Sequence, residues 1–389
     1  MHDRSFHRWL LTLCCLVLVW QAPGSVSGFQ QASQTVAEQP SAQQELQDPT
    51  KPPLDASPQV PQPDQVDQAI DRAIAYLLTE QQENGSFGNR SHDTTMTALG
   101  VMALACVGTT PDQNDQRGQA MRRALDFVLT NRQEESGYFG KRDGSRMYGH
   151  GIITLMLSEM LGMGADQQQD NAIQEQCEKG IQLILESQKQ NKPPIFRGGW
   201  RYTPDANDSD LSVSVWQVMA LRSAKTDGIE VPDQAISQAI DYFRRSCTSP
   251  LDGTGVPLRE EAGFSYTPGS DQIKFTMTAA GLLAMQVCGQ YESPLVEKSA
   301  DWLLAHPPKH DERFFYYGAY YYAQGMYQRG GAYHEAARDH IRQILLEKQQ
   351  ADGHWEGYGE EAGAGPVYTT CLAILSLGVK YHYLPIYQK

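Results

Sequence analysis

One short pattern recurs along this chain of 389 residues: an amphipathic stretch ends in Gln, and a Gly and an aromatic residue follow within a few positions. Five copies are recognisable, and their aromatic residues are Phe87, Phe139, Trp200, Phe264 and Trp355. The copies are spaced by roughly 50–65 residues, except for a gap of about two such steps before the last one. Self-similarity at a fixed period predicts a repeat architecture before any single residue is interpreted.

Each repeat is predicted to contribute two helices of different character. The segment Val66–Leu78 carries apolar residues at i, i+3, i+4 and i+7 and a charged opposite face, as a surface helix does. The segments that follow the turns are apolar almost all round, as buried helices are, and include Met96–Leu104, Val213–Leu221 and Met277–Met285. One amphipathic and one buried helix per unit indicate an outer and an inner ring.

The long gap before the last copy is expected to hold a degenerate unit, around Leu295 to Arg329. The prediction is therefore an all-α (α/α)6 toroid of about six helix pairs over residues 65–389. An open helical solenoid is the alternative, but neither end of the repeats shows the obvious polar cap that an open array needs.

The N-terminal segment has the composition of an export signal followed by a tether. Residues 1–28 contain the basic Arg4 and Arg8, the apolar run Trp9–Trp20 and then small residues, which is typical of a secretory signal peptide. Residues 29–64 are rich in Gln, Pro and Ser and are predicted to be a disordered tether. We expect a secreted or periplasmic protein of the cell envelope, and an uncleaved membrane anchor is the alternative.

Charge and cysteine content bear on partners and cofactors. The net charge is −14 and no stripe of Lys and Arg is present, so a nucleic-acid partner is not expected. No spacing matches a zinc motif, and no motif implies a cofactor. In the predicted ring, no two of the five cysteines beyond the signal come within disulfide range. They are predicted to be small core hydrophobes: Cys106, Cys177, Cys247, Cys288 and Cys371.

The repeated Gln-x-x-x-Gly-x-Trp-like turns with paired helices resemble those of the squalene and hopene cyclases and of the protein prenyltransferase β-subunits, which share an α/α toroid. The resemblance covers essentially residues 65–387 and implies one toroid, whereas squalene cyclases have two. It indicates the fold superfamily and leaves the activity open. The superfamily also includes complement-type thioester domains, but the Cys-Gly-Glu-Gln stretch of that branch is absent from this sequence.

The zinc chemistry of the prenyltransferase branch is not expected. That branch binds zinc through an Asp-x-Cys on one inner helix and a His on a later one. Here Asp210 matches the Asp, but Ser212 stands in place of the Cys and Thr369 in place of the His. One ligand of three cannot hold zinc, so no metal site is predicted.

The cyclase branch implies a catalytic acid. Its Asp-x-Asp-Asp-Thr-Ala segment opens an inner helix and presents a buried carboxylic acid that protonates an alkene. Asp208 and Asp210 match the Asp-x-Asp, but the Asp-Thr-Ala that should follow is missing. Asp210 is the candidate general acid, with Asp208 and His150 as neighbours. The alternatives are that Asp210 is a helix N-cap and that His150 is a hydrogen-bonded core histidine.

Aligning the inner helices places one residue of each unit at an equivalent level: Thr97, His150, Ser214, Thr278, Tyr317 and Thr370. If this level faces the central cavity, these side chains would contact a ligand there. Three aromatic residues near the turns are further candidates for ligand binding: Trp200, Tyr202 and Trp355. For the turn aromatics, packing between repeats is the alternative.

Three functions remain open. The first is an exported terpenoid-cyclase-like toroid that binds an isoprenoid-like or other mostly apolar ligand; as an enzyme it would be a squalene-cyclase-like isomerase or lyase. The second is a non-catalytic binding or interaction module with a partner in the envelope. The third is a secreted carbohydrate-active enzyme, which needs paired carboxylates. A dry pocket with one carboxyl would favour the first, a cavity filled by side chains the second, and two carboxyls across a wide groove the third.

Overall fold

The computed structural model describes residues 63–88, 91–130, 132–381, 383–384 and 386. The predicted signal peptide (1–28) and all but the last two residues of the predicted tether (29–64) lie outside these ranges. The described residues belong to the second of two units into which the chain divides, residues 61–389. They form helices and isolated β-bridges, and no β-strand occurs among them.

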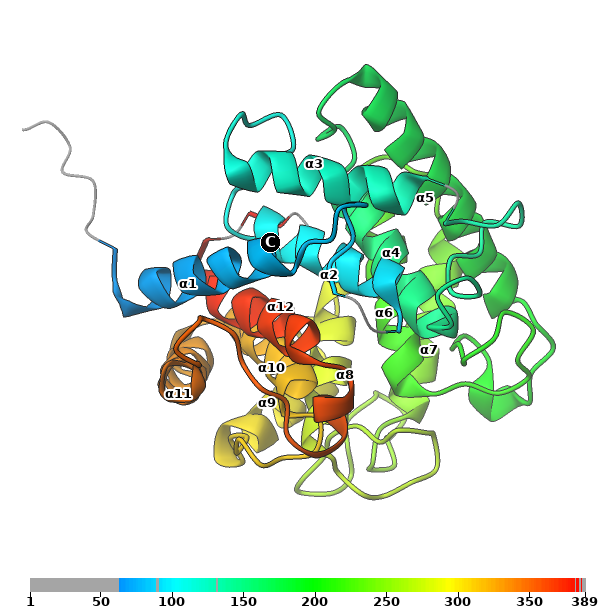
Figure 1. The fold of residues 1–389 in the computed structure, drawn as a ribbon. Coiled ribbons are helices and arrows are strands. Elements are labelled where there is room, and N and C mark those ends of the chain that lie inside the picture. Colours follow the sequence, from blue (N-terminus) through cyan, green and yellow to red (C-terminus); the bar gives the residue numbers. More distant parts are fainter. Residues whose placement is uncertain (1–62, 89–90, 131, 382, 385, 387–389) are drawn as a thin grey trace, which may run out of the picture. The chain divides into compact units, whose positions relative to one another are not determined.

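In the described part of the chain, twelve α-helices alternate between two concentric rings (Figure 1). The outer ring consists of α1 (Gln65–Glu80), α3 (Gln116–Leu129), α5 (Gln167–Gln188), α7 (Asp233–Arg245), α9 (Pro294–Ala305) and α11 (Gly331–Lys348). The inner ring consists of α2 (Asp93–Ala105), α4 (Arg146–Glu159), α6 (Leu211–Thr226), α8 (Phe275–Val287), α10 (Phe315–Arg329) and α12 (Pro366–Leu377). The degenerate unit that the spacing predicts is therefore present as α9 and α10.

The inner ring is closed. Each inner helix packs against the next inner helix along the chain, and α12 packs against α2, which completes the circle. In the outer ring, α1 also packs against α11, so the first and last units meet there as well. The prediction of an all-α toroid with an inner and an outer ring is confirmed, and the open solenoid is excluded for this chain.

The recurring glutamine joins neighbouring units. The side-chain amide of Gln349 donates to the carbonyl of Gly353 in its own turn and to the carbonyl of Ala69 in α1, both at 2.8 Å. The amide carries two N–H donors, so one side chain satisfies two carbonyls at once. The same pair of bonds, to the turn glycine and to the next outer helix, is made by Gln81, Gln133 and Gln188. The bond from Gln349 to Ala69 links the last unit to the first.

The turn glycine is required by its own backbone and by the neighbouring unit. Gly353 has a φ of +102°, in the region that favours glycine, and a Cβ there would lie 2.3 Å from the carbonyl oxygen of Arg72 in α1. The equivalent glycines also have positive φ and face a carbonyl of the next outer helix: Gly85, Gly137 and Gly198. A side chain at these positions would push adjacent units apart.

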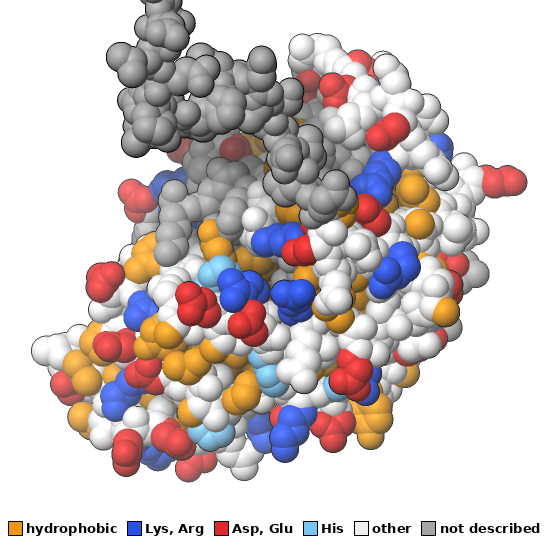
Figure 2. All heavy atoms as spheres, turned by 90° about the vertical axis from the view of Figure 1, so that its left-hand side faces the viewer, with side chains coloured by type: hydrophobic (Ala, Val, Ile, Leu, Met, Phe, Trp, Pro, Cys, Tyr) orange, Lys and Arg blue, Asp and Glu red, His pale blue; other side chains and the backbone are white. Residues whose placement is uncertain are grey.

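All five cysteines beyond the signal are free and buried, as predicted. Among the described helices, none combines the length and the apolar composition needed to cross a bilayer. On the face over α1 and α11, acidic and basic side chains are interspersed and hydrophobic side chains occur in small groups (Figure 2).

Candidate functional site

Asp210 precedes the third inner helix and is both an N-cap and a buried carboxylate. Its Oδ1 accepts hydrogen bonds from the backbone N–H of Val213 at 3.0 Å and from the hydroxyl of Ser212 at 2.6 Å. The side chain has no exposed area, and Oδ2 accepts no hydrogen bond within the described part of the chain. Burial raises the pKa of Asp210, against the opposing effect of these hydrogen bonds and of Arg201. The N-cap that the sequence left as an alternative is present, together with a desolvated carboxyl.

Arg201 contacts both of the aspartates that the sequence predicts for the site. Its Nε lies 3.4 Å from Oδ2 of Asp210, and its Nη1 lies 3.3 Å from Oδ2 of Asp208. The guanidinium carbon also lies 5.0 Å from the ring centroid of Tyr202 and 5.6 Å from that of Tyr266. The hydroxyls of the two tyrosines are hydrogen-bonded to each other. We call these five residues the rim cluster: four of them lie where the turn of the third unit enters its inner helix, and Tyr266 reaches them from the turn of the fourth unit.

The six residues at the equivalent level do not behave alike. Five of them accept a hydrogen bond from the backbone N–H of the turn aromatic in their own unit, at 2.9–3.4 Å: Thr97, His150, Ser214, Thr278 and Thr370. The predicted equivalence of these positions is therefore seen in the structure. Their side chains face the turns between the two rings, and their predicted contact with a ligand stays a prediction.

His150 makes no hydrogen bond to the rim cluster among the described residues. Its Nε2 lies 3.1 Å from the carbonyl of Gly180 in α5, to which it donates, and its Nδ1 accepts from the backbone N–H of Phe139. Burial lowers the pKa of His150 to about 4, so the ring is neutral near pH 7. These partners are those of the core histidine that the sequence offered as the alternative, and a catalytic role for His150 stays a prediction.

The turn tryptophans are buried and hydrogen-bonded to the outer helices of their own units, α5 and α11. The indole Nε1 of Trp200 donates to the carbonyl of Ile184, and that of Trp355 donates to the carbonyl of Leu345, both at 2.8 Å. Both side chains have no exposed area. Tyr202 differs from them, because it is half-buried and belongs to the rim cluster.

The centre of the ring is filled by aromatic side chains. Trp216 of α6 stacks on Tyr320 of α10, with ring centroids 5.5 Å apart and planes 6° apart. Tyr317 of α10 lies 6.4 Å from Trp216 and 6.0 Å from Tyr148 of α4, measured between ring centroids. Helices α4 and α10 belong to the second and fifth of six units, so they face each other across the ring. The aromatic side chains between them therefore occupy its axis.

Hydrogen bonds fix this aromatic centre. The hydroxyl of Tyr317 donates to the carbonyl of Ser212 at 3.1 Å and accepts from the hydroxyl of Tyr321 at 3.0 Å. Tyr317 is 5% exposed, and burial raises the pKa of its phenol well above the ordinary value. Among the six residues of the equivalent level, Tyr317 is thus the one that points to the axis, where it fills space.

A carboxylate that the sequence analysis did not select caps α10. Glu361, in the short 3-10 helix η2 (Gly359–Gly363), accepts from the backbone N–H of Tyr317 at 3.0 Å and from that of Tyr316 at 3.1 Å. The α10 N-cap residue, Phe314, offers no side-chain cap of its own. Burial raises the pKa of Glu361 to about 7. Glu361 therefore supplies, from a distant part of the chain, the cap that Phe314 does not provide.

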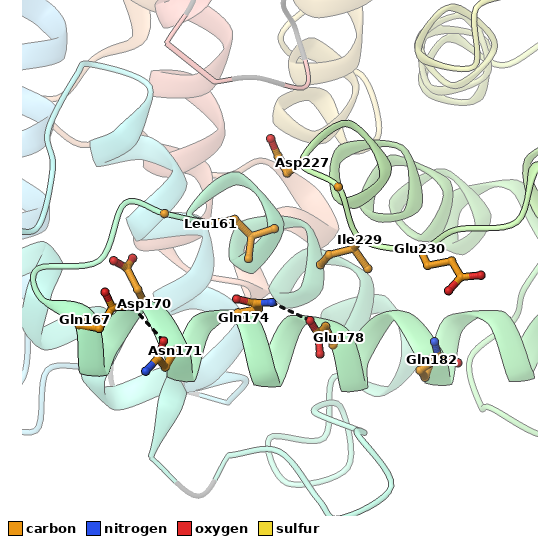
Figure 3. A pocket seen from close by; sticks show the side chains of 12 residues that line it. Leu161, Gln167, Asp170, Asn171, Gln174, Glu178, Gln182, Asp227, Ile229 and Glu230 are labelled. Atoms are coloured by element: carbon orange, nitrogen blue, oxygen red, sulfur yellow. Dashed lines mark hydrogen bonds between the residues drawn. The ribbon is translucent and has the colours of Figure 1, made fainter. Parts of the chain in front are cut away.

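A wide acidic groove of about 710 Å³ runs along α5 (Figure 3). The loops that follow α4 and α6 form its other wall, where Leu161 and Ile229 lie. Its lining includes four carboxylates and no Lys or Arg: Asp170, Glu178, Asp227 and Glu230. The amides along α5 pair within the helix, since Gln174 donates to Glu178 at 2.9 Å. The groove lacks the apolar lining of a typical small-molecule site.

Comparisons with known proteins bear on the fold. No family model and no curated protein matches the sequence. Among solved structures, the GH76A α-1,6-mannanase of Salegentibacter sp. HEL1_6 is similar, with a TM-score of 0.56 and 12% identity over 82% of this chain and 100% of that chain. The type II terpene cyclase MstE from Scytonema, in complex with geranylgeranyl dihydroxybenzoate, has a TM-score of 0.52 and 17% identity over 83% and 98%.

A third similar structure is an unsaturated glucuronyl hydrolase specific for heparin, with a TM-score of 0.54 and 13% identity over 81% of this chain and 96% of that chain. These similarities place the chain among the α/α toroids, in agreement with the resemblance drawn from its repeats. Proteins of this one fold act on very different molecules, so the fold by itself decides no activity.

Proposed function

We propose that this chain is a non-catalytic saccharide-binding module of the cell envelope, which holds its ligand at the rim cluster. The observation that carries the proposal is the filled centre: Trp216, Tyr317 and Tyr320 occupy the axis of the ring. Protein interiors are close-packed, with few voids larger than a water molecule. The filled centre argues against an isoprenoid-like ligand at the axis, and with it against cyclase chemistry.

The rim cluster has chemistry suited to a sugar. Tyr266 is 37% exposed, and a tyrosine combines an apolar ring face with a polar edge. The partly exposed side chains of Arg201 and Asp208 supply donors and acceptors for hydroxyl groups. Among the similar structures, the mannanase and the glucuronyl hydrolase act on saccharides and the terpene cyclase does not, so the choice of a saccharide rests on the rim cluster and the filled centre.

A carbohydrate-active enzyme is the second candidate. It is favoured by the desolvated carboxyl of Asp210, which shares Arg201 with Asp208, because glycoside hydrolysis uses two carboxyl groups, one of them protonated. We place it second because the Asp210 side chain has no exposed area and its Oδ1 caps α6. A substrate could reach Oδ2 only after the rim cluster rearranged.

Native mass spectrometry of the full chain tests the proposal, with soluble neutral oligosaccharides and, separately, with an envelope lipid extract. We expect retained saccharide, no retained lipid and no cleavage product. Replacing Tyr202 and Tyr266 together by Ala should weaken saccharide binding at least about fivefold, or about 1 kcal/mol. The control Tyr383→Ala removes an exposed tyrosine that lies against Gly108, after the C-terminal end of α2, and should change nothing. Retained lipid, or unchanged affinity in the double variant, would overturn the proposal.

Asp210→Asn separates the two candidates. Asn caps helices about as well as Asp, so the fold should survive. Because the Asp210 side chain has no exposed area and does not touch a ligand at the rim, a binding module should keep its affinity in this variant, whereas an enzyme that uses Asp210 as its acid should lose its hydrolytic products. Release of products by the wild type and their loss in Asp210→Asn would put the enzyme first.

The envelope location is part of the proposal and rests on the signal-like residues 1–28. N-terminal sequencing of the exported protein should find a start close to residue 29. A start at Met1 in a membrane fraction would favour the uncleaved anchor.

A further inference from the structure

A second groove, lined by arginines, lies beside the rim cluster. It encloses about 520 Å³, a size typical of ligand sites, and is formed by η1 (Pro194–Phe196), the end of α7 and the long turn between α7 and α8. Gly269, which lines it, lies in the same turn as Tyr266 of the rim cluster, and Ile195 approaches Gly269 across the groove. We call it the arginine groove.

Two guanidiniums of the arginine groove are held by backbone carbonyls. Arg245 donates from Nε to the carbonyl of Ile195 at 3.2 Å and from Nη2 to the carbonyl of Arg197. Arg259 donates from Nη1 to the carbonyl of Thr248 at 2.8 Å. Within the described ranges, no carboxylate lies at ion-pair distance from Arg245 or Arg259. Their positions are thus fixed without a direct ion pair, and Asp241 acts on Arg245 only at longer range.

Such an arrangement is unexpected on a chain with a net charge of −14. A third lining arginine, Arg244, has its nearest acid, Asp241, at 3.7 Å, and Asp271 is an acid in the groove lining. Burial lowers the pKa of Arg245, yet a guanidinium stays protonated in proteins. Arg197 repels the charge of Arg245, and an anion bound in the groove would offset that repulsion.

We infer that the arginine groove binds the acidic group of an anionic saccharide, a carboxylate or a sulfate, whose sugar rings continue onto the rim cluster. The inference rests on the proposed function and names its class of ligand. Arginine presents planar N–H donors that match the oxygens of such a group, and Arg259 has donors free after its one backbone bond. The apolar side chains of Ile195 and Leu251 in the lining can pack against a sugar ring.

Calorimetric titration of the full chain tests this with three probes of matched length: an oligogalacturonate, a heparin-derived oligosaccharide and a neutral oligosaccharide. We expect at least one anionic probe to bind about tenfold more tightly than the neutral probe at low salt. The difference should shrink as salt is added, because the charges near the surface become screened. Comparison of the two anionic probes tells carboxylate from sulfate recognition.

Variants of the groove locate the effect. Arg245→Gln combined with Arg259→Gln should abolish the preference for the anionic probe and leave the affinity for the neutral probe unchanged. The control removes the same charge from the outer helix α11 by Arg338→Gln and Arg342→Gln, and should keep the preference. Arg245 also holds the backbone at η1, so its replacement can disturb the fold. Arg259 has only one backbone hydrogen bond, and Arg259→Gln alone should lose part of the preference for the anionic probe.

The outcomes separate this inference from the proposed function. A neutral probe that binds as tightly as both anionic probes would overturn the inference and leave the rim cluster as the site. Failure of all three probes would overturn both proposals. If the groove variants keep the preference for the anionic probe, the groove is not the binding site. Poly-glutamate serves as a further probe: if it binds as tightly as the anionic saccharides and with the same dependence on the two arginines, the ligand is not specifically a saccharide.

Discussion

Replacing Gly353 by Ala tests whether the ring closes by the same packing that joins its other units. Gly353 lies in the last turn, and its neighbour Arg72 lies in the first helix, so the substitution acts only on the closing contact. A non-glycine residue with strongly positive φ costs about 1–2 kcal/mol. The added Cβ, 2.3 Å from the Arg72 carbonyl oxygen, forces a backbone shift of the kind that costs about 1–3 kcal/mol.

The expected loss is therefore about 2–5 kcal/mol in the free energy of unfolding, out of a typical total of about 5–15 kcal/mol. Gly228→Ala is the matched control, because Gly228 has a φ of +91° but no heavy atom within 4 Å of a Cβ placed there. It carries the backbone strain without the clash, so it should cost about 1–2 kcal/mol. Gly137→Ala, whose Cβ would meet the Lys179 carbonyl oxygen at 2.4 Å, gives the same clash between two internal units.

Urea unfolding followed by far-UV circular dichroism measures all three variants, with linear extrapolation to water. The reasoning requires Gly353→Ala and Gly137→Ala to lose similar stability and both to exceed Gly228→Ala by about 1–3 kcal/mol. If Gly353→Ala matched Gly228→Ala while Gly137→Ala did not, the closing contact would be loose, and the chain would behave as an open solenoid in solution.

Two further predictions follow from buried groups. Burial raises the pKa of Glu159 and of Glu361 from 4.5 to about 7, so the folded state binds these protons more tightly than the unfolded state. Each carboxyl therefore lowers the free energy of unfolding as pH rises from about 4.5 to about 7, by an amount on the order of 2–3 kcal/mol. Glu159→Gln should flatten this part of the pH dependence in urea titrations, whereas the exposed Glu360→Gln should not, and an unchanged slope in Glu159→Gln would contradict the assignment. Trp216→Ala should cost about 3–5 kcal/mol and open a cavity at the axis that binds an apolar probe such as benzene, detectable by a thermal shift that the wild type lacks. Absence of that shift would mean that the centre collapses when the indole is removed.

The sequence predicts the fold well because the repeat is enforced locally. A glutamine amide with two carbonyl partners and a glycine with positive φ against a neighbouring backbone recur in four of the six turns, so the repeat is readable from its spacing. Even the unit that lacks a clear turn, α9 and α10, could be placed from the gap it leaves. The inner helices are readable for the same reason, since a helix covered on all sides must be apolar on all sides.

The candidate site is less predictable, because equal positions in a repeat do not fix which way a side chain faces. Thr97 and Ser214 are equivalent, as the alignment of the inner helices predicts, yet their hydroxyls accept from the turn backbone, and only Tyr317 of this level points to the axis. Whether such a side chain faces the axis or the turns depends on how its helix packs against neighbouring helices. The sequence of one repeat does not show that packing.

Charge clusters made in three dimensions are the hardest to see. The sequence has no stripe of basic residues, and an acidic chain of this kind gives no reason to expect one. The turns of the third and fourth units nevertheless bring Arg245 and Arg259 to one groove and set Arg201 between Asp208 and Asp210. These turns extend well beyond what joining an outer to an inner helix requires in the fifth unit, where residues 306–314 suffice. In a toroid whose axis is filled, binding residues can be added in long turns without disturbing the helix packing. Both proposed sites accordingly lie on the longest turns rather than inside the ring.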